Sequence, residues 1–474
     1  MSLRDYQENS IAEIKTLYRQ NTRKVLLWLA TGAGKTVIFS RMVKDCDARG
    51  KRAIVVVRGR KLVDQASQRL FREHVAHGVM MASHWNNRPH LPVQVCSVDT
   101  LISRQLRPPA DLIILDEADL ATSEGYRTFL SDYPQAFVAS FTATPYVSGG
   151  LRHVADAIVH PISMMGLIEQ GYLCGFRYFA PSEPDLTNVQ VSASTKDYVV
   201  DQLEGAMIAG QLTGRIVDHW KKIAENRPTL CFAVNVRHSK ILCEKFLEAG
   251  IMAEHCDANT PDDERNAIQK RVENGETKIV CNVGILGRGV DIPCVSALIM
   301  ARPTKSKNLF IQQAGRGTRL FDGKPNCILL DHAGNIGRHG LPTDEPDVDL
   351  DGRERKQTVS ETKICKNCFA AYRGKVCPEC GVVPPEMPRP IIEETDAELT
   401  EIHEEFDPIK KELKRLLRER KNTNRKMGWV YHRLVDKFSY EEVKHLLPMW
   451  FIGQRTINER DPFFGSPFTY KVIK

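Results

Sequence analysis

The chain has 474 residues, of which 42% are hydrophobic and 26% are charged, a composition typical of globular proteins. At about 150 residues per domain, this length allows two to four domains. No apolar run approaches the ~20 residues that a membrane-spanning helix needs, and the first residues, MSLRDYQENS, contain no apolar segment. We therefore expect a cytoplasmic protein with no signal peptide and no membrane partner.

The net charge of +7 is concentrated in one short segment. Residues 410–426 contain nine Lys and Arg against two Glu, so this segment alone accounts for the whole excess. A concentrated basic segment favours a polyanionic partner, although a solvated helix face has the same composition.

Two series of short apolar runs alternate with helix-like segments, which is the pattern of parallel sheets covered by helices. The first series comprises Val25–Leu29, Ala53–Val57, Val93–Val98, Leu112–Asp116 and Phe137–Thr142. The second comprises Thr229–Val234, Ile251–His255, Lys278–Asn282, Ala297–Met300 and Cys327–Leu330. We predict an α/β fold class with two tandem parallel-sheet domains, at residues 1–155 and 156–340.

A glycine-containing loop follows the first apolar run and precedes a helical pattern. Successive backbone amides of such a loop can point at one phosphate group, and the helix adds its positive N-terminal end. Lys35 would reach the β- and γ-phosphates, and the Thr36 hydroxyl would bind magnesium. Leu29 replaces the first glycine of the strict pattern, so a plain turn before a helix is the alternative. The predicted nucleotide-binding residues here are Thr31, Gly32, Ala33, Gly34, Lys35 and Thr36.

Two carboxylates follow the apolar run at 112–115. In a parallel sheet, this is the edge where ligands bind. Asp116 is predicted to hold magnesium, and Glu117 to polarise the attacking water as a general base. A solvated acidic run is the alternative, but four apolar residues precede this pair.

The segment that begins at Gln312 carries Arg316 and Arg319, three residues apart and therefore on one face of a helix. Guanidinium groups match phosphate oxygens and stabilise charge on a transferring phosphoryl group. We predict that Gln312, Arg316 and Arg319 are catalytic, with a surface ion-pair face as the alternative.

Residues 341–361 are polar and charged, and we predict a linker there. The stretch CKNCFAAYRGKVCPEC follows, within a module at 362–384. Two tight pairs of thiolates suit a closed, structural zinc site, and a redox CxxC pair or an iron–sulfur cluster is the alternative. The predicted zinc ligands are Cys365, Cys368, Cys377 and Cys380.

Residues 385–474 are predicted to be helical and basic after a Pro-rich spacer. Asp407 and Pro408 suit the start of a helix, and Ser439 with Glu442 suits a capping box. We hypothesise that the module and the basic helix Lys410–Lys426 grip DNA. The module residues concerned are Lys363, Lys366, Tyr372, Arg373 and Lys375. The alternative is that the module only fastens the C-terminal helices to the rest of the chain.

Taken in order, these motifs resemble those of the superfamily 2 helicases and translocases, over residues 1–340. The phosphate loop, the Asp-Glu-Ala-Asp box at 116–119 and the arginine pair are similar to that family's nucleotide motifs, and Ser140–Pro145 to its coupling motif. The resemblance implies two RecA-like domains with ATP and magnesium in the cleft between them.

Further candidate residues rest on this resemblance alone. Arg4 and Gln7 resemble a glutamine motif that reads adenine, and Gly289 with Asp291 resembles a motif of the second domain, so all four are predicted to bind the nucleotide. Nucleic-acid contacts are predicted at Arg58, Arg60, Thr100 and His238.

Three features are similar to one branch, the RadD-like bacterial and phage DNA helicases: Ile168–Cys174, Asp331–Asn335 and the four-cysteine module. This likeness implies ATP-driven remodelling of single-stranded or branched DNA in repair or recombination, with a protein partner from those processes. An RNA helicase is one alternative. A nucleic-acid-binding protein that uses ATP as a switch, with little turnover, is another.

Overall fold

The structure is a computed structural model that describes residues 3–181, 184–193, 195–209, 212–284, 292–346, 348–353, 362–383, 408–423 and 427–443. The chain divides into two compact units, Met1–Glu386 and Met387–Lys474. Among the described helices, none is both long enough and apolar enough to span a membrane.

A seven-stranded sheet forms the centre of the first domain, and every strand pair in it is parallel. The strand order is β3-β4-β2-β5-β6-β1-β7. Central strands such as β2 are buried along their whole length, as expected for a sheet covered on both faces. The strands are β1 (Lys24–Trp28), β2 (Ala53–Val57), β3 (Gly78–Met80), β4 (Val93–Ser97), β5 (Leu112–Leu115), β6 (Phe137–Thr142) and β7 (Ala157–Val159).

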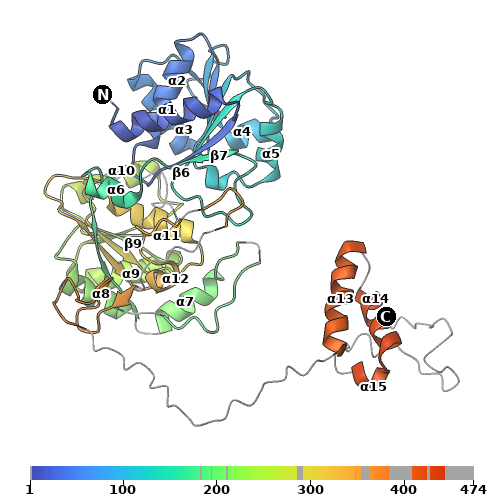
Figure 1. Cartoon of the computed structure of the whole chain (residues 1–474). Helices are drawn as coiled ribbons and strands as arrows, with labels where there is room; N and C mark the ends of the chain where they lie inside the picture. Colours follow the sequence, from blue (N-terminus) through green and yellow to red (C-terminus); the bar gives the residue numbers. More distant parts are fainter. Residues whose placement is uncertain are drawn as a thin grey trace. The chain divides into compact units, whose positions relative to one another are not determined.

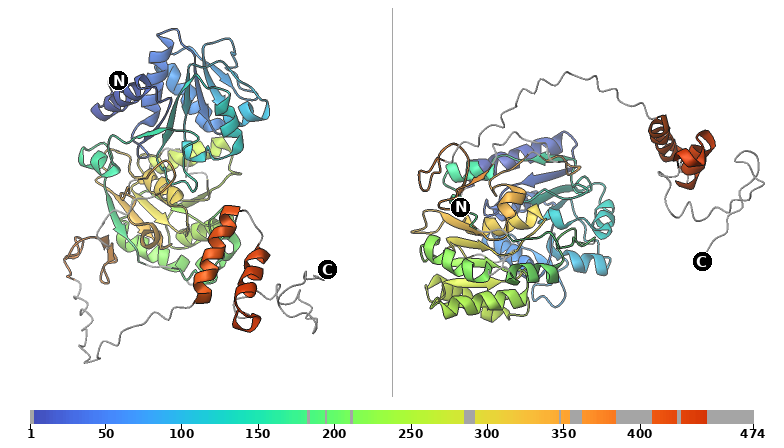
Figure 2. Two further views of the ribbon diagram at one scale, coloured as in Figure 1. Left: turned by 45° about the vertical axis from the view of Figure 1, so that its right-hand side comes forward. Right: turned by 90° about the horizontal axis from the view of Figure 1, so that it is seen from below.

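Helices cover both faces of this sheet (Figures 1 and 2). One face packs in a core cluster with α1 (Asp5–Arg19), α2 (Lys35–Asp47) and α3 (Arg60–Arg72). The other packs with α4 (Val98–Ser103) and α5 (Glu124–Ser131). The short α6 (Met164–Glu169) also joins the first cluster, through Met164 and Leu167.

The second domain has a six-stranded parallel sheet in the order β10-β11-β9-β12-β13-β8. Its strands are β8 (Phe176–Phe179), β9 (Thr229–Phe232), β10 (Ala253–Cys256), β11 (Ile279–Asn282), β12 (Ala297–Met300) and β13 (Cys327–Asp331). Its helices are α7 (Val200–Ala209), α8 (Leu212–Ile223), α9 (Val236–Glu248), α10 (Asp262–Glu273), α11 (Lys307–Ala314) and α12 (Asn335–His339). The predicted fold class of two parallel-sheet α/β domains is confirmed.

All ten predicted strands are present, within two residues at either end. The sequence missed three strands at sheet edges: β3, β7 and β8. Because β7 pairs with β1, the first sheet continues beyond the predicted boundary at residue 155, and the second sheet begins at Phe176.

The predicted linker at 341–361 is wrong for its described part, residues 341–346 and 348–353. Leu350 is buried in a core cluster of the first domain, and its carbonyl accepts a 2.8 Å hydrogen bond from the Leu151 amide. Glu345 accepts a 2.8 Å hydrogen bond from the Met164 amide. This polar segment is therefore a strap that leaves the second domain and packs on the first.

The four-cysteine module packs against the second domain. Its hairpin pairs β14 (Lys363–Ile364) with β15 (Ala371–Tyr372), and Ala370 bridges to Phe179 in β8. Cys365 and Tyr372 belong to the second domain's core cluster. Tyr372 is only 5% exposed, and Arg373 donates to Asp344, so these two side chains hold the module in place. Lys363, Lys366 and Lys375 are exposed, and their contact with DNA stays a prediction.

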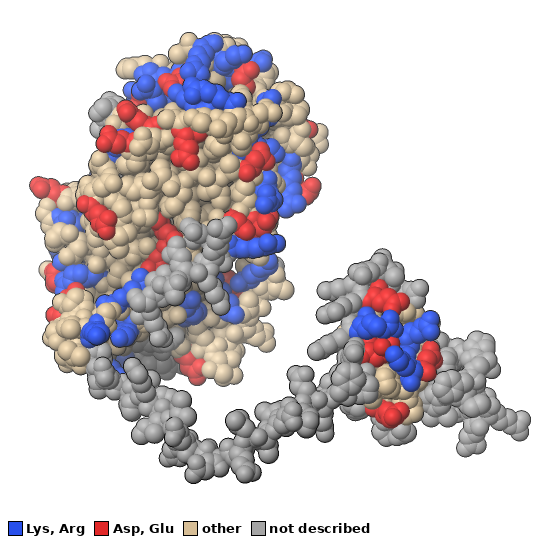
Figure 3. Space-filling view, viewed as in Figure 1, with Lys and Arg blue, Asp and Glu red and all other residues tan. Residues whose placement is uncertain are grey.

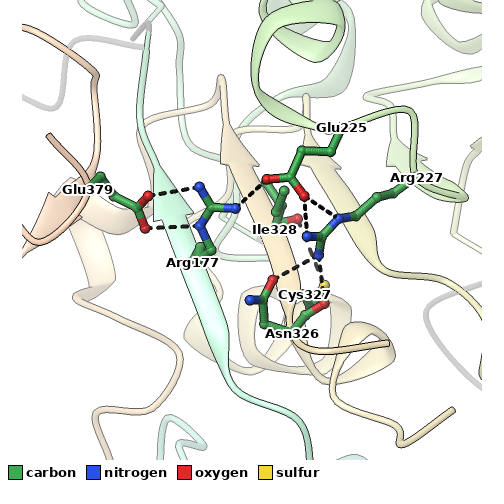
Figure 4. A network of polar contacts seen from close by, with 7 residues as sticks. All are labelled: Arg177, Glu225, Arg227, Asn326, Cys327, Ile328 and Glu379. Atoms are coloured by element: carbon green, nitrogen blue, oxygen red, sulfur yellow. Dashed lines mark hydrogen bonds and ion pairs between the residues drawn. The ribbon is translucent and has the colours of Figure 1, made fainter. Parts of the chain in front are cut away.

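A line of charged residues reinforces this contact (Figure 4). Arg177 on β8 donates two hydrogen bonds to Glu379 of the module, at 3.0 and 2.8 Å. It also pairs with Glu225, which in turn binds Arg227. Arg227 then donates to the carbonyl of Asn326, just before β13.

The second unit contains α13 (Pro408–Thr423), α14 (Met427–Lys437) and α15 (Tyr440–Val443). The predicted helix start at Pro408 is confirmed, and the Ser439 amide donates to Glu442 as the capping box requires. Described charges on α13 are paired, because Glu412 binds both Arg415 and Lys437. Figure 3 shows blue and red side chains side by side on this unit, so its described surface is a mixed ion-pair face.

Candidate functional site

The glycine-containing loop connects β1 to α2 at the carboxyl edge of the first sheet. Gly32 and Gly34 adopt φ angles of +86° and +78°, which a residue with a Cβ rarely adopts. These two left-handed residues turn the loop so that α2 begins at Lys35 with its N-terminus facing the loop. The local geometry is that of a phosphate-binding loop, despite Leu29 in the place of a glycine.

Lys35 extends back over the loop and donates to the carbonyls of Leu29 and Ala30, at 3.1 and 3.3 Å. Burial lowers its pKa, and the charges of Glu117 and Asp116 oppose that effect. The ammonium group thus lies among carboxylates and carbonyls, at a place where phosphate oxygens would be competing partners.

Asp116 and Glu117 follow β5 at the same sheet edge. Burial, and then the Glu117 charge, raise the pKa of Asp116 to about 7, while Lys35 opposes this rise. A divalent cation would supply the positive charge that keeps this carboxylate ionised. Asp116 and the Thr36 hydroxyl are oxygen donors of the kind that magnesium prefers, so the residues present fit the ion.

Glu117 has a strained backbone, with φ at +52° in the left-handed region. Its amide donates to Asp116 Oδ1 at 3.0 Å, and its buried Oε2 accepts no hydrogen bond from any described residue. A buried carboxylate oxygen without a partner is well suited to accept a proton from a water molecule.

The arginine pair comes from the second domain. The chain passes from α11 into the short 3₁₀ helix η2 (Gly315–Gly317). Gly315 lies so close to the phosphate loop that a Cβ added to it would be 2.6 Å from Thr31 Cβ. Arg316 and Arg319 line the same cavity, of about 420 Å³, as the loop and the carboxylates. The structure therefore brings the predicted Lys35, Asp116, Glu117, Arg316 and Arg319 together.

Gln312 comes from α11 of the second domain. It lies beside the cavity and donates across the domain boundary to Asp119 Oδ2 and Thr144 Oγ1, at 3.3 and 3.2 Å. Asp119 in turn accepts a hydrogen bond from Thr142 at 3.0 Å. These hydrogen bonds suit a positioning role, and a catalytic role for Gln312 stays a prediction.

The adenine-reading candidates lie next to the phosphate loop. Gln7 is 4% exposed, accepts from the Arg4 amide at 3.1 Å and donates to the Ala33 carbonyl at 3.3 Å. Tyr6 donates to the same carbonyl at 2.7 Å. These contacts fix α1 to the loop, and adenine recognition stays a prediction. Gly289 and Asp291 lie outside the described residues.

The four nucleic-acid candidates differ in exposure. Arg58 and Arg60 are exposed, Thr100 is half-buried, and His238 is fully buried. His238 Nδ1 accepts from the Val234 amide at 3.4 Å, and burial lowers its pKa to about 4. The prediction of a nucleic-acid contact is wrong for His238, whose ring supports the turn before α9.

One wall of the cavity, formed by α3, was not predicted from the sequence. Several α3 side chains line it and recur at intervals of three and four residues, the spacing of one helix face. The sequence signal that could have identified this wall is the helical periodicity that follows Arg58 and Arg60. These residues are Leu62, Gln65, Gln68, Arg69 and Arg72.

The four cysteines of the module form a compact cluster. The Sγ atoms of Cys365 and Cys380 are 3.6 Å apart, as are those of Cys368 and Cys377, and all four lie within 4.8 Å of one another. A tetrahedral zinc site with Zn–S bonds of about 2.3 Å has sulfur atoms about 3.8 Å apart. The cluster therefore fits a structural zinc ion.

Family comparisons agree with this geometry. Residues 1–147 match the family described as "Type III restriction enzyme, res subunit", and residues 212–320 match "Helicase conserved C-terminal domain". The fold is similar to "a putative HsdR subunit of a type I restriction enzyme" from Vibrio vulnificus YJ016, with 18% identity, a TM-score of 0.54 and coverage of 74% of this chain and 70% of the other. It is also similar to the "ATP-dependent Type ISP restriction-modification enzyme LlaBIII bound to DNA", with 17% identity, a TM-score of 0.50 and coverage of 69% and 27%.

Curated relatives carry related names. "Putative ATP-dependent helicase IRC3" of Saccharomyces cerevisiae is 30% identical over 405 residues, which are 79% of this chain and 58% of that protein. A "51.5 kDa protein" of a Lactococcus phage (isolate 7-9) is 29% identical over 361 residues, which are 74% of this chain and 76% of that protein. The chain thus spans less than two thirds of the first relative. Its first parallel-sheet domain is thus similar to a restriction-enzyme family, and its second to the helicase C-terminal domain family.

Proposed function

We propose that this protein is an ATP-driven motor that moves along DNA. The observation that carries the proposal is the single cavity that the phosphate loop, Asp116, Glu117 and two arginines of the second domain share. A site built from both domains is completed only when they are close together, which links the nucleotide's state to domain movement.

The chemical roles follow from the geometry. When bound, a magnesium ion would supply positive charge that offsets the charge of the phosphates. Asp116 and Thr36 would hold the ion, and Lys35 would replace its two carbonyl contacts with phosphate contacts. Glu117 would orient and deprotonate the attacking water with its unpartnered oxygen, while Arg316 and Arg319 would stabilise charge that develops on the transferred phosphoryl group.

Gln312 would couple ATP hydrolysis to the movement of the two domains. Its hydrogen bonds to Asp119 and Thr144 join the second domain to residues directly after the carboxylate pair and after β6. When the nucleotide is released, these bonds and the Gly315–Thr31 contact would separate. Alternate closing and opening would then advance the motor along a strand that the exposed Arg58 and Arg60 help to hold.

We favour DNA over RNA because one structural neighbour is described as DNA-bound and because the sequence resembles RadD-like helicases, whose work is in repair and recombination. In this proposal the substrate is single-stranded or branched DNA, and a repair or recombination protein recruits the motor. RNA is the competing substrate in the experiment below.

The test measures ATP turnover of the full chain without nucleic acid and with single-stranded DNA, branched DNA or RNA of equal length. DNA should stimulate turnover strongly and RNA weakly. Glu117→Gln should lower stimulated turnover by about 10²- to 10⁴-fold and leave ATP binding intact. Glu124→Gln, an exposed acid in the same domain, is the matched control. Equal or greater stimulation by RNA would overturn the DNA assignment, and slow, Glu117-independent turnover would favour an ATP switch.

A further inference from the structure

Trp85 exposes more of its surface than any other large hydrophobic residue that the structure describes, at 76%. Two other tryptophans, Trp28 and Trp220, are 3% and 2% exposed. Large aromatic residues are normally buried extensively on folding, so an indole that is held in solvent indicates a binding surface. Trp85 lies in the loop between β3 and β4, outside all of the motifs discussed above.

The indole rests on a second aromatic ring. Its ring centroid is 6.0 Å from that of Phe71, with only 10° between the ring planes. Phe71 itself is 44% exposed. This stacked pair of rings, here called the Trp85 platform, is open to solvent on the first domain.

One face of α3 supports the platform. Asp64, Ser67 and Phe71 lie three and four residues apart, so their side chains project in the same direction. Asp64 accepts from His84 Nε2 at 3.1 Å, Ser67 bonds to His77 Nε2 at 2.8 Å, and Phe71 supports Trp85. The helix therefore fixes the loop at both ends of the segment 77–85.

The residues around Trp85 are held rigidly. The Asn86 amide donates to His84 Nδ1 at 3.1 Å, and the Asn86 side chain donates to the His77 carbonyl at 3.1 Å. Asn86 also accepts from the Val79 amide at 2.8 Å. His77, His84 and Asn86 are buried, so the exposed indole sits on a preorganised base and loses little conformational freedom on binding.

The surroundings are basic. Residues 58–90 contain six Lys and Arg against one Asp and one Glu. Arg88, three residues after Trp85, is exposed. Arg60 donates to the Ala82 carbonyl at 3.3 Å, so the loop adjoins a predicted nucleic-acid contact. Flat aromatic rings beside arginines suit a strand with phosphates and accessible base faces.

We propose that the Trp85 platform stacks an unpaired base of a single strand, while Arg88 contacts a flanking phosphate. A duplex is excluded as the stacked ligand because its base faces are covered by neighbouring base pairs. The proposal rests on the proposed function as a nucleic-acid motor and assigns a contact outside the motifs of that motor.

The test compares binding of the full chain to a labelled single-stranded DNA and to an abasic strand of the same length and charge. The wild type should prefer the normal strand. Trp85→Ala should weaken binding to the normal strand about tenfold and remove most of the preference, because stacking requires a base. Trp85→Phe should retain most of the affinity for the normal strand and most of the preference for it over the abasic strand. Met252→Ala, at another exposed apolar residue (57%) but in the second domain, should behave as wild type.

Indole fluorescence gives an independent readout. Normal strands should quench the wild type more than abasic strands do, and Trp85→Phe should lose that difference while it still binds. Unchanged binding of Trp85→Ala, or an equal loss on normal and abasic strands, would overturn the platform even if DNA still stimulates ATP turnover. If no nucleic acid binds the wild type or stimulates it, both the platform and the proposed function fail.

Discussion

The two contacts that the second domain makes within Met1–Glu386 differ in kind. Across the nucleotide cleft, it meets the first domain mainly through side-chain hydrogen bonds of 3.2 to 3.5 Å and a close glycine contact, with Ile311 as a buried apolar contact. The second domain contacts the four-cysteine module through a strand bridge, a shared apolar core and an arginine–carboxylate pair with two hydrogen bonds. Polar contacts that water can replace suit a cleft that opens, whereas buried apolar contacts suit a permanent attachment.

The largest expected effect is a loss of stability when the four-cysteine module, the permanently attached part, is disrupted. Cys365→Ser should remove one of the four thiolates that fit a zinc ion, so the module should lose metal binding and unfold, because so small a segment has no independent core. The second domain would then expose apolar surface that Ala370 and Tyr372 now cover. We expect zinc content to fall from one ion per chain to almost none and the melting temperature to fall by several degrees. Cys46→Ser, at a cysteine outside the cluster, is the control.

Retention of zinc and an unchanged melting temperature in Cys365→Ser would contradict this account of the module. Removal of the metal from the wild type with a chelator should reproduce the variant's behaviour.

A smaller effect is expected at the cleft. Gln312→Ala removes the hydrogen bonds to Asp119 and Thr144, and a bond to a charged group contributes roughly 1.5–3 kcal/mol. DNA-stimulated turnover should therefore fall about tenfold or more, while ATP affinity stays within about twofold. Gln313→Ala is a matched control, since the buried Oε1 of Gln313 accepts no hydrogen bond from the described residues. Equal effects of the two variants would argue against a coupling role for Gln312.

The smallest effect is expected at the line of charges in Figure 4. Arg177 and Glu379 are 30% and 24% exposed, so solvent screens their attraction. Arg177→Met should lower the free energy of unfolding by at most about 1 kcal/mol and leave ATP turnover unchanged. Denaturant titration measures the first quantity. A loss as large as that of Cys365→Ser would show that the ion pairs, and not the apolar core, attach the module.

Much of the fold could be predicted because its signals are local. Buried parallel strands are apolar along their whole length, so all ten predicted strands were found, but short edge strands such as β3 and β7 lack that signature. The phosphate loop and the carboxylate pair follow strand ends directly, which fixes their place in the sheet. The strap at 341–346 and 348–353 was missed because its polar composition gives no sign of the few buried contacts, such as that of Leu350, that hold it.

The limits of the site prediction have a physical cause as well. A motif gives the type of a residue but not its burial. His238 was predicted from its motif to contact nucleic acid, but its buried ring supports the turn before α9. Gln312 was placed in the correct motif, but its direction across the cleft depends on Asp119 and Thr144, which are far away in the sequence. Trp85 belongs to no motif, and only its exposure in the folded chain identifies it.

The central claim is that arginines of the second domain complete a nucleotide site on the first. The most direct test measures ATP binding and single-turnover hydrolysis, with DNA present, for Arg316→Ala and Arg319→Ala. We predict ATP binding within a few-fold of wild type and hydrolysis slower by about 10³-fold or more, as for other arginines that act across a cleft. Hydrolysis at the wild-type rate in both variants would contradict the account.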